Sequence, residues 1–365
     1  DELDAKLKEI NKRYVELGLD LKTADDFIEK RINDAEKYLI ALAEVLASGY
    51  VNRENIFQAA REILASVGES HSAFNSVNIL NKSGINAVLV DLSGFQDSLP
   101  LTIDQRVQQS LKDIDFSNNV TIVTGYTKGT EGIMREFDRG YSEVTFSKVA
   151  VAVKADEAII HKEYHLSSAD PNLVGVENCV PVGFTNYDVA DQLADVGMEA
   201  IHPKAAKPLE INRINLRIKN TFEPDHPGTL ITKDYVGENK RVEVITGTDK
   251  VLIIDVHDPL MVGTVGYDLN LMKEFASYNI SYICKATSAN SISVVIWEKD
   301  HKEELIKLLE SRYQTVVVKK VAIVCLIGTN IDQPGVLAKA AKSLGDNNIN
   351  ILAASHSLRQ VNIQF

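Results

Sequence analysis

The sequence is poor in cysteine and in positive charge. Its 365 residues include three cysteines, Cys179, Cys284 and Cys325, and none of them stands in a CxxC pair or at a spacing typical of metal ligands. We therefore expect buried thiols in a reducing cytoplasm. The 51 acidic side chains outnumber the 39 basic ones, which gives a net charge of -12. This charge disfavours nucleic acid or an anionic membrane as the main partner.

Long apolar runs and terminal signals are also missing. The longest apolar stretches, such as 321–327, are far shorter than the roughly 20 residues of a membrane-spanning helix. The chain starts with neither a basic segment nor an apolar core, so no signal peptide is expected. It has no initiator methionine, and we expect it to begin inside a longer gene product. The length predicts two or three domains, and 45% hydrophobic with 25% charged residues is typical of a soluble globular protein.

Apolar periodicity predicts helices over 1–85 and an α/β region after them. One apolar stripe recurs at helical spacing from Ile28 to Leu46, and a second runs from Ile56 to Val67, with Gly68 as the expected stop. From residue 86 on, β-branched segments alternate with helical ones. The expected strands are 87–92, 121–126, 157–160, 215–220 and 228–232, and the expected helices include 142–153 and one within 185–203. This alternation predicts a three-layer α/β architecture with an open, mostly parallel sheet.

An internal repeat follows a polar linker at 233–241. Gly266 matches Gly335, and apolar residues match at the same offset: Leu252 with Val321, Ile254 with Ile323, Ile280 with Ile349, Ile292 with Val361, Val294 with Ile363, and Ile296 with Phe365. Each copy reads as strand, glycine-bearing loop, helix, strand and strand, which predicts two small α+β modules. The first copy continues into a helix at 302–313 and a strand at 315–320. The second stops in its third strand, so further residues are expected after Phe365.

The segment 123–153 holds the most informative candidate site. A strand ends before a glycine-bearing loop, and a helix is expected to start near Ser142, a good N-cap residue. The N–H groups of that helix start, the permissive backbone of Gly140 and the guanidinium of Arg139 suit a carboxylate or a phosphate. Two acidic side chains are candidate partners for an ammonium group: Glu69 and Glu143. The residues alone fit an ordinary capped helix with a surface arginine equally well.

Two other segments contain residues of types that occur in ligand-binding or metal-binding sites. The helix within 332–344 carries apolar residues that are expected to face a core: Val336, Leu337, Ala340, Ala341 and Leu344. Its loop is a candidate effector site, formed by Asp332, Gly335 and Asn350, and the corresponding loop of the first module is 257–266. His161 and His165 are not expected to bind a metal, because a strand leading into a loop does not place them on one helix face.

Several segments resemble the aspartokinases, a family with the amino-acid kinase fold. DRGYSEVTFS (138–147) is similar to the family's arginine-glycine-glycine-serine-aspartate segment, and SVGESHSAFN (66–75) resembles its glutamate-bearing helix. Three more segments follow in the family's order and at about its spacing: SSADPN (167–172), MEAIHPKA (198–205) and NTFEPDHPGTLI (220–231). The doubled module resembles the ACT regulatory pair of this family. Together with the tail SLRQVNIQF, the first segment looks most like the branch associated with ectoine biosynthesis.

The resemblance implies two regions, a kinase domain over 1–235 and a tandem ACT-like region of βαββαβ modules over 236–365. In the family, the first ACT unit is inserted within the second. The first module would then span about 249–318, and the second would combine 241–248 with 319–365. The segment 242–247 would be the partner strand of 361–365. Because ACT units usually pair edge to edge, a homodimer or higher oligomer is expected.

The resemblance also implies roles for single residues. Arg139 would hold the α-carboxylate of aspartate, Glu69 would hold its ammonium group, and Ser142 would help to seat it, with Glu143 beside them where most of the family has aspartate. The residues expected near the phosphates of ATP and its Mg2+ are Asp170, Lys162 and Lys204. An effector such as threonine or lysine would bind near Asp332, Gly335 and Asn350. No catalytic residue and no protein ligand of the metal is identified.

The sequence departs from the family pattern mainly on the nucleotide side. The family's opening strand, whose lysine and paired glycines bind phosphates, does not occur within these residues, so we expect no ATP turnover from them alone. Tyr141 stands where the family has its second glycine, His161 and Lys162 replace a threonine-aspartate pair near the adenine, and Glu199 replaces a lysine. An anion at this last position would repel ATP unless a cation such as Lys162 or Lys204 compensates for it.

The resemblance thus implies an aspartate kinase, which uses ATP to phosphorylate the β-carboxylate of L-aspartate. The product would be 4-phospho-L-aspartate, and the step would be the first towards aspartate-family amino acids or ectoine. The ACT modules would bind an end-product amino acid and shift the kinase between two states. Two alternatives stay open: a non-catalytic amino-acid sensor that keeps the aspartate pocket and the ACT pair, and a kinase of another amino acid such as glutamate, whose relatives lack the doubled tail.

Overall fold

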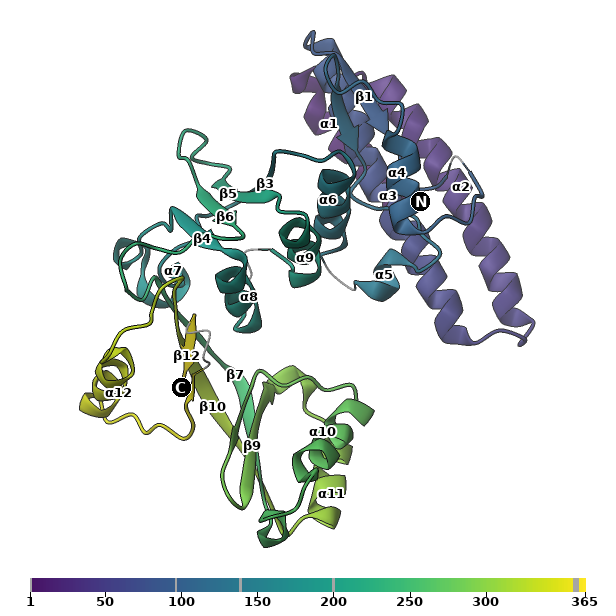
Figure 1. Cartoon of the computed structure of the whole chain (residues 1–365). Helices are drawn as coiled ribbons and strands as arrows, with labels where there is room; N and C mark the ends of the chain where they lie inside the picture. Colours follow the sequence, from purple (N-terminus) through teal and green to yellow (C-terminus); the bar gives the residue numbers. More distant parts are fainter. Residues whose placement is uncertain (1, 96, 138–139, 199–200, 357–360) are drawn as a thin grey trace. The chain divides into compact units, whose positions relative to one another are not determined.

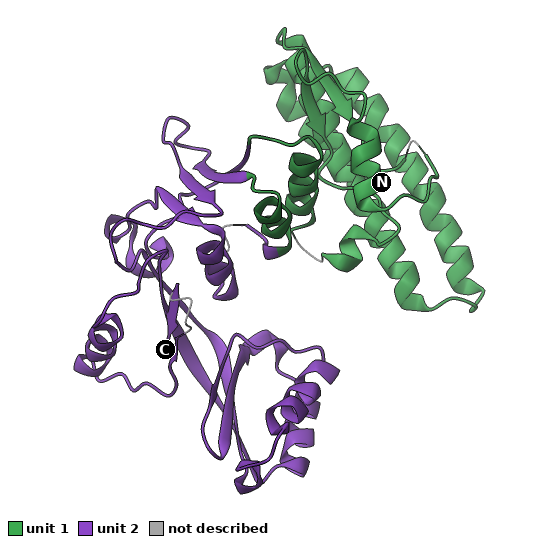
Figure 2. Ribbon diagram, viewed as in Figure 1, with its two compact units in different colours: residues 1–156, 204–214 green, residues 157–203, 215–365 purple. Residues whose placement is uncertain are grey.

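The computed structural model describes residues 2–95, 97–137, 140–198, 201–356 and 361–365. The chain divides into two compact units, which Figure 2 distinguishes by colour. Unit 1 contains Asp1–Asp156 with Lys204–Ile214, and unit 2 contains Glu157–Pro203 with Asn215–Phe365. The expected boundary between a kinase and a regulatory region at residue 235 differs from this division and stays a prediction. Among the described residues, no helix is both long enough and apolar enough to cross a membrane.

Unit 1 begins with helices, as the apolar periodicity predicted (Figure 1). They are α1 (Glu2–Tyr14), the short 3-10 helix η1 (Val15–Leu17), α2 (Leu21–Ala47) and α3 (Arg53–Lys82). The start of α2 is fixed by Asp20, whose Oδ1 accepts a hydrogen bond from the backbone N–H of Thr23 at 2.8 Å. The apolar stripe of α2 packs through Ile28 and Ala35 against Leu7 and Val67 of its neighbours.

The helix α3 continues through Gly68, where the sequence predicted a stop. A glycine inside a helix costs about 1 kcal/mol relative to alanine. Burial of Val67, Ser70 and Ala73 around this point offsets that penalty, because the hydrophobic contribution of one buried apolar side chain is about 1.5–3 kcal/mol. As a result, Glu69 lies within a continuous 30-residue helix and not at a junction between two helices.

The sheet of unit 1 is small and parallel. It consists of β1 (Ala87–Val90) and β2 (Val120–Val123), which pair in register. The remaining helices of the unit are α4 (Ile103–Leu111), α5 (Ile133–Glu136), α6 (Tyr141–Ala152) and α9 (Pro203–Ile211). Val90 and Leu92 pack against Val107 and Leu111 of α4 and against Val149 of α6. Both strands end earlier than predicted, since the backbone N–H of Leu92 donates to Thr124 Oγ1 at 2.9 Å in place of a ladder carbonyl.

Unit 2 contains a second α/β sheet, which is mixed. Its strands are β3 (Glu157–Lys162), β4 (Phe184–Asn186), β5 (Asn215–Asn220) and β6 (Thr229–Thr232), in the order β3-β5-β6-β4, and its helices are α7 (Pro171–Val174), η2 (Val176–Asn178) and α8 (Tyr187–Asp195). The pairs β3–β5 and β4–β6 are parallel, while β5 and β6 are antiparallel. The connection 221–228 is too short for the crossover that parallel neighbours need. The α/β class is confirmed, and the predicted strands are divided between two sheets.

The C-terminal part of unit 2 is one six-stranded antiparallel sheet. Its elements are β7 (Val244–His257), η3 (Pro259–Met261), α10 (Tyr267–Ser277), β8 (Cys284–Thr287), β9 (Ser291–Trp297), η4 (Glu298–Asp300), α11 (Glu303–Arg312), β10 (Thr315–Ile327), α12 (Val336–Asp346), β11 (Ser355–His356) and β12 (Asn362–Gln364). The strand order is β11-β12-β10-β7-β9-β8. The helices α10 and α12 begin at matching positions of the repeat, each after a glycine with positive φ (81° at Gly266 and 91° at Gly335). The internal repeat is therefore real.

The long strands β7 and β10 each contribute to both modules. Residues 251–257 of β7 pair with 315–321 of β10, and residues 244–248 pair with 323–327, with an irregularity after Val321. The segment 242–247 was expected to pair with 361–365, and this pairing is wrong. Instead β12 pairs with β10, which lies between β12 and β7. The reason is topological. In the second module, residues 244–248 pair with the first strand, 323–327, on the side away from β12. In the first module, residues 315–320 pair in the same way with the first strand, 251–257.

The predicted matches in the first strand of each module are displaced by one residue. In the first module, Ile254 and Val256 pack with α10 and α11. By the offset of the repeat, Ile323 should face α12, but it packs with Leu193 of α8 on the opposite face. Leu326 is the strand residue that packs near Val336 of α12. Because side chains alternate along a strand, one extra residue reverses every facing.

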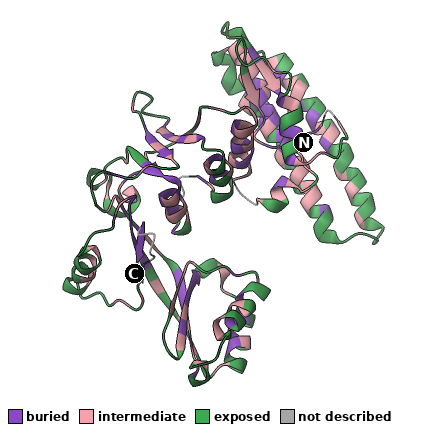
Figure 3. Ribbon diagram, viewed as in Figure 1, coloured by how far each residue is buried: buried purple, intermediate pink, exposed green. Residues whose placement is uncertain are grey.

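The helix α12 covers its sheet less completely than the sequence predicted. Its bounds agree with the predicted helix, but none of its residues is buried, whereas α10 and α11 bury residues such as Phe275 and Leu309 (Figure 3). Val336 and Ala340 contact the sheet, while Leu337 is 45% exposed. The apolar periodicity therefore predicted where the helix α12 lies in the sequence, but not how far its side chains are buried.

Candidate active site

Glu69 and Ser142 lie 73 residues apart in sequence and are joined by a hydrogen bond, in which Ser142 Oγ donates to Glu69 Oε1 at 2.7 Å. The sequence predicted that Ser142 would cap the helix. In the structure the N-cap residue is Gly140, with a φ of 75°, and a glycine has no side chain with which to cap α6. A glycine tolerates this left-handed conformation, and Ser142 becomes the second helical residue. Its hydroxyl is therefore used by Glu69 and not by the helix backbone.

Gly125, two residues after β2, allows this contact to form. A Cβ atom at this position would lie 2.4 Å from Glu69 Oε2 and 3.0 Å from Ser142 Oγ. Any side chain would therefore push the carboxylate away from the end of the strand. The helix α3, the loop after β2 and the start of α6 thus converge on one carboxylate. The strand-glycine pattern of 121–126 was visible in the sequence, but it did not connect Gly125 to Glu69.

Tyr141 is a second residue of α6 at this carboxylate. Burial, the negative charge of Glu69 and a hydrogen bond to Glu69 raise the pKa of the Tyr141 phenol above its usual value. Its ring meets the ring of Tyr126 edge-on, with centroids 6.3 Å apart and an interplanar angle of 72°. The sequence marked Tyr141 only as a departure from the family pattern, in which this position is glycine. The structure gives it a partner.

Glu62 occupies the same face of α3 as Glu69, two helical turns earlier. Its Oε2 accepts a hydrogen bond from Tyr126 Oη at 2.7 Å, and its Oε1 accepts from the backbone N–H of Met134 at 2.7 Å. Burial and the bond to Glu62 raise the pKa of Tyr126 strongly. Glu62 therefore holds the start of α5, and periodicity alone did not single it out.

Of the two other predicted substrate residues, the structure describes Glu143 but not Arg139. Arg139 lies outside the described residues, as does Glu199. Glu143 is half-buried in the first turn of α6. A negative charge is favourable there because the helix N-terminus carries a partial positive charge. The role of each in binding stays a prediction.

Lys204 belongs to unit 1, at the start of α9. Its ammonium donates to the backbone carbonyl of Glu136 at 3.1 Å and lies 4.9 Å from the centre of the Phe137 ring. Lys204 borders a groove of about 850 Å³ that also contains Lys148, Lys154 and Lys207. Its surroundings within unit 1 are thus rich in positive charge, which suits an anionic ligand.

Lys162 and Asp170 belong to unit 2 and lie in sequence on either side of a short loop. Lys162 is the last residue of β3, and its carbonyl accepts a hydrogen bond from the backbone N–H of Thr221 at 2.8 Å. Asp170 caps α7, where its Oδ1 accepts from the backbone N–H of Asn172 at 2.8 Å. The parallel strands β3 and β5 end at this edge, the usual place for ligands in open α/β sheets.

A histidine pair at the same edge was not anticipated. His165 Nε2 lies 3.1 Å from Glu223 Oε2, and the His165 side chain is only 10% exposed. The rings of His165 and His226 have centroids 4.1 Å apart. Within the described ranges, no group of three or more His, Cys, Asp or Glu side chains is arranged to hold a metal ion. The pairing could not be found from the sequence, because the two histidines are far apart along the chain and no local pattern links them.

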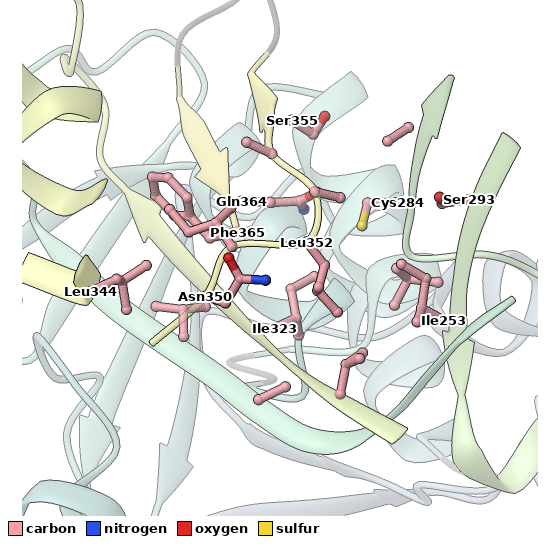
Figure 4. A pocket seen from close by; sticks show the side chains of 18 of the residues that line it. Ile253, Cys284, Ser293, Ile323, Leu344, Asn350, Leu352, Ser355, Gln364 and Phe365 are labelled. Atoms are coloured by element: carbon pink, nitrogen blue, oxygen red, sulfur yellow. The ribbon is translucent and has the colours of Figure 1, made fainter. Parts of the chain in front are cut away.

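Neither of the two pockets described beside α12 is lined by all three candidate effector residues. Gly335 borders a pocket of about 630 Å³ between α12 and the sheet. Asn350 borders another, of about 340 Å³, whose wall is mostly apolar. Figure 4 shows Asn350 between Leu344 and Leu352 in this second pocket, with Ile323 across from them. Asp332 is exposed and is not among the residues that line either pocket.

Comparisons with known proteins agree on one family. The model of the amino acid kinase family matches residues 9–220. Aspartate kinase Ask_Ect of Stutzerimonas stutzeri (strain A1501) is 45% identical over 351 residues, which cover 94% of this chain and 73% of that protein. Aspartokinase 1, chloroplastic, of Arabidopsis thaliana is 28% identical over 344 residues, and the match spans 60% of its length.

Solved structures agree on the fold. The aspartate kinase of Clostridium acetobutylicum matches 99% of this chain and 80% of its own, with a TM-score of 0.75 and 21% identity. Aspartokinase III of E. coli, in complex with aspartate and ADP, matches 93% of this chain and 78% of its own, with a TM-score of 0.71 and 18% identity.

Proposed function

We propose that Glu69, Ser142 and Gly125 form part of an aspartate site. The chain belongs to the amino acid kinase family and, within that family, to the aspartate kinases. The reaction there is transfer of the γ-phosphoryl group of ATP to the β-carboxylate of L-aspartate, which gives 4-phospho-L-aspartate and ADP. The observation that carries the proposal is the Ser142–Glu69 contact at the end of β2. It presents a carboxylate whose described partners are neutral hydroxyl groups.

Such a carboxylate suits the ammonium group of an amino acid. An ammonium has three N–H donors and no acceptor, so it matches an anion whose partners among the described residues are neutral. Arg139 follows from the family resemblance as the partner of the α-carboxylate, through a two-pronged guanidinium contact. The ammonium group of aspartate would then pair with Glu69, and its α-carboxylate would pair with Arg139. The β-carboxylate would stay free to accept the phosphoryl group.

The nucleotide and its Mg2+ would be held by Asp170, Lys162 and Lys204. The cap of α7 uses one oxygen of Asp170, and the second oxygen of this carboxylate would be a ligand of the kind that Mg2+ prefers. When bound, Mg2+ neutralises charge on the phosphates. The task of the lysines is electrostatic as well, because phosphoryl transfer depends mainly on alignment and on stabilisation of negative charge.

The C-terminal sheet is proposed to be regulatory. E. coli aspartokinase III has been solved with lysine and aspartate in a T-state, and its fold matches 93% of this chain with a TM-score of 0.66. We infer that lysine or threonine binds to the ACT-like modules of this chain. We also infer that the chain forms a homodimer or higher oligomer through these modules. Its product would enter the biosynthesis of aspartate-family amino acids or of ectoine. The pocket bordered by Asn350 is the candidate effector site.

The substrate assignment is tested by Glu69→Gln in the full-length protein, with a hydroxamate assay for aspartyl phosphate. The amide cannot neutralise an ammonium, and the loss of a charge-assisted contact of about 2–4 kcal/mol predicts a fall in kcat/KM for aspartate of roughly 30- to 1000-fold. The matched control is Glu54→Gln, an exposed position of the same helix. An unchanged KM for aspartate in Glu69→Gln would remove Glu69 from the site.

A further inference from the structure

We propose that Glu62 is a positioning residue of the aspartate site: from α3 it fixes the loop after β2 and the helix α5, and through them the surroundings of Glu69. This inference rests on the proposed function, because it takes Glu69 as the ammonium partner. It gives Glu62 an effect on the binding of aspartate without any contact between Glu62 and the substrate.

One oxygen of Glu62 supplies the cap that α5 lacks. The N-cap residue of this short helix is Gly132, which has no side chain. Glu62 Oε1 instead accepts hydrogen bonds from the backbone N–H groups of Met134 at 2.7 Å and of Arg135 at 3.3 Å. These N–H groups belong to the first turn of α5 and have no partner inside the helix. Because a single helical turn is not stable by itself, the position of α5 depends on this carboxylate.

The backbone of Gly132 leaves room for the Glu62 carboxylate. Its φ of 76° is a conformation that glycine tolerates and other residues rarely adopt. A Cβ atom at Gly132 would lie 3.0 Å from Glu62 Oε1, and a Cβ atom at Gly125 would lie 2.4 Å from Glu69 Oε2. Both carboxylates of α3 therefore meet a glycine of the segment between β2 and α6. The two contacts together fix this segment against one face of α3.

The other oxygen of Glu62 fixes the loop after β2. Tyr126 Oη donates to Glu62 Oε2 at 2.7 Å, and the Tyr126 residue is only 4% exposed. Burial and the bond to Glu62 raise the pKa of the phenol, so it remains a donor at neutral pH. Tyr126 directly follows Gly125, the glycine that lies against Glu69. A displacement of Tyr126 would therefore also displace the backbone beside Glu69.

The next residue, Thr127, connects the loop to α6. Its Oγ1 lies 3.0 Å from Thr145 Oγ1 in a buried hydrogen bond, and Thr145 follows Ser142 by about one turn of α6. Ser142 in turn donates to Glu69. These contacts form a closed ring from Glu62 through the loop and α6 back to Glu69. Without the Glu62 carboxylate, aspartate would have to order the loop when it binds, which costs binding free energy.

The experiment is steady-state kinetics of the full-length protein, with aspartate varied at saturating ATP. We expect Glu62→Ala to raise the KM for aspartate about tenfold, because hydrogen bonds to a charged acceptor are lost, and to change kcat less than about threefold. Glu62→Gln should bring the KM back to within about threefold of the wild type. Its amide oxygen can still accept from Met134, and its amide nitrogen can donate to the Tyr126 hydroxyl.

Asn52→Ala is the matched control for a loss of stability. Asn52 caps the start of α3, where its Oδ1 accepts from the backbone N–H of Glu54 at 2.8 Å. Its removal should lower the Tm by about 2–4 °C and leave the KM for aspartate within about twofold, because unfolding lowers the amount of active enzyme and not its affinity. An unchanged KM in Glu62→Ala, or an equal rise in Asn52→Ala, overturns the inference.

Tyr126→Phe tests the contact between Glu62 and the loop. It removes only the hydroxyl that donates to Glu62. We expect it to raise the KM for aspartate about threefold in the wild type and less than about 1.5-fold in the Glu62→Ala background. An effect of full size in that background would show that Tyr126 acts by another route, and the placement of the loop by Glu62 would be wrong.

Glu69→Gln separates this inference from the proposed function. If Glu69→Gln raises the KM for aspartate and Glu62→Ala does not, this inference falls and the proposed function stands. If Glu69→Gln has no effect, the aspartate site is rejected, and this inference with it.

Discussion

Arg31 of α2 forms an ion pair with Asp91, just after β1, and the two side chains are only 4% and 10% exposed. The guanidinium also lies between two aromatic rings, 5.0 Å from the centre of Phe27 and 4.7 Å from that of Phe95. Asp91 in turn accepts from the hydroxyl and the backbone N–H of Ser93. This pair connects the helical start of the chain to the sheet of unit 1.

Removing one member of this pair should destabilise the protein severely. Arg31→Ala leaves the Asp91 carboxylate buried without its cation, which predicts a loss of about 3–5 kcal/mol in the free energy of unfolding. Denaturant titration measures it. Arg13→Ala, whose side chain is 72% exposed beside Glu9, is the control and should change stability by less than about 0.5 kcal/mol. A loss below about 1 kcal/mol for Arg31→Ala would mean that water reaches Asp91.

Gly125 and Gly68 should respond in opposite ways to alanine. At Gly125 the new methyl group would overlap Glu69 Oε2, so Gly125→Ala should lower kcat/KM for aspartate by at least about tenfold, a loss of roughly 1.4 kcal/mol or more. At Gly68 nothing lies within 4 Å of the added atom, and Gly68→Ala should stabilise α3 by about 0.5–1 kcal/mol with unchanged kinetics. Normal aspartate use by Gly125→Ala would show that the carboxylate can move without loss of function.

The half-buried thiol of Cys284 and the buried thiol of Cys325 should make the free energy of unfolding fall at high pH. Burial raises the pKa of Cys284 to about 11 and that of Cys325 to about 12, from an ordinary value of 9.0. The folded state therefore binds these protons more tightly than the unfolded state. Their contribution to stability is complete below pH 9 and is lost as the pH rises towards 11–12.

Denaturant titrations between pH 8 and 12 would measure this loss. The variant Cys284→Ala combined with Cys325→Ala serves as the control, because lysines and tyrosines titrate in both proteins. We expect the wild type to lose stability more steeply with pH than the double variant. Identical slopes would show that the thiols are not protected from solvent.

Asn350 should matter for inhibition and not for catalysis. It lies in the apolar pocket between the strands of the first module and residues of the second (Figure 4), where an amide is suited to the polar head of an amino acid. Asn350→Ala should raise the concentration of lysine or threonine needed for half-inhibition about tenfold, since a hydrogen bond to the charged head of the effector would be lost, while the KM for aspartate stays the same. Asp332→Asn, outside the lining of this pocket, is the control. If only Asp332→Asn weakens inhibition, the effector binds elsewhere.

Local patterns in the sequence were sufficient for most individual elements. The stripe from Ile28 to Ala35 predicted α2, the β-branched runs predicted β1 and β5, and the internal repeat predicted that α10 and α12 would correspond. These features depend on interactions between near neighbours, such as helical side-chain spacing, strand alternation and the backbone freedom of Gly266 and Gly335. The family resemblance, which rests on short ordered segments, predicted Glu69 and Ser142 as substrate residues. It did not predict the hydrogen bond between these two side chains.

The arrangement of these elements depended on contacts between distant residues. Burial around Val67 carried α3 through Gly68, and the left-handed Gly140 turned Ser142 from a helix cap into a partner of Glu69. One additional residue before Leu326 reversed the facing of β10, and the long strands β7 and β10 placed 244–248 away from β12. The sequence by itself determined which segments are helices, which are strands and to which family they belong, because those properties arise within a few turns or residues. The tertiary structure alone decided which side chains meet at Gly125, because close packing selects among partners that local energies cannot distinguish.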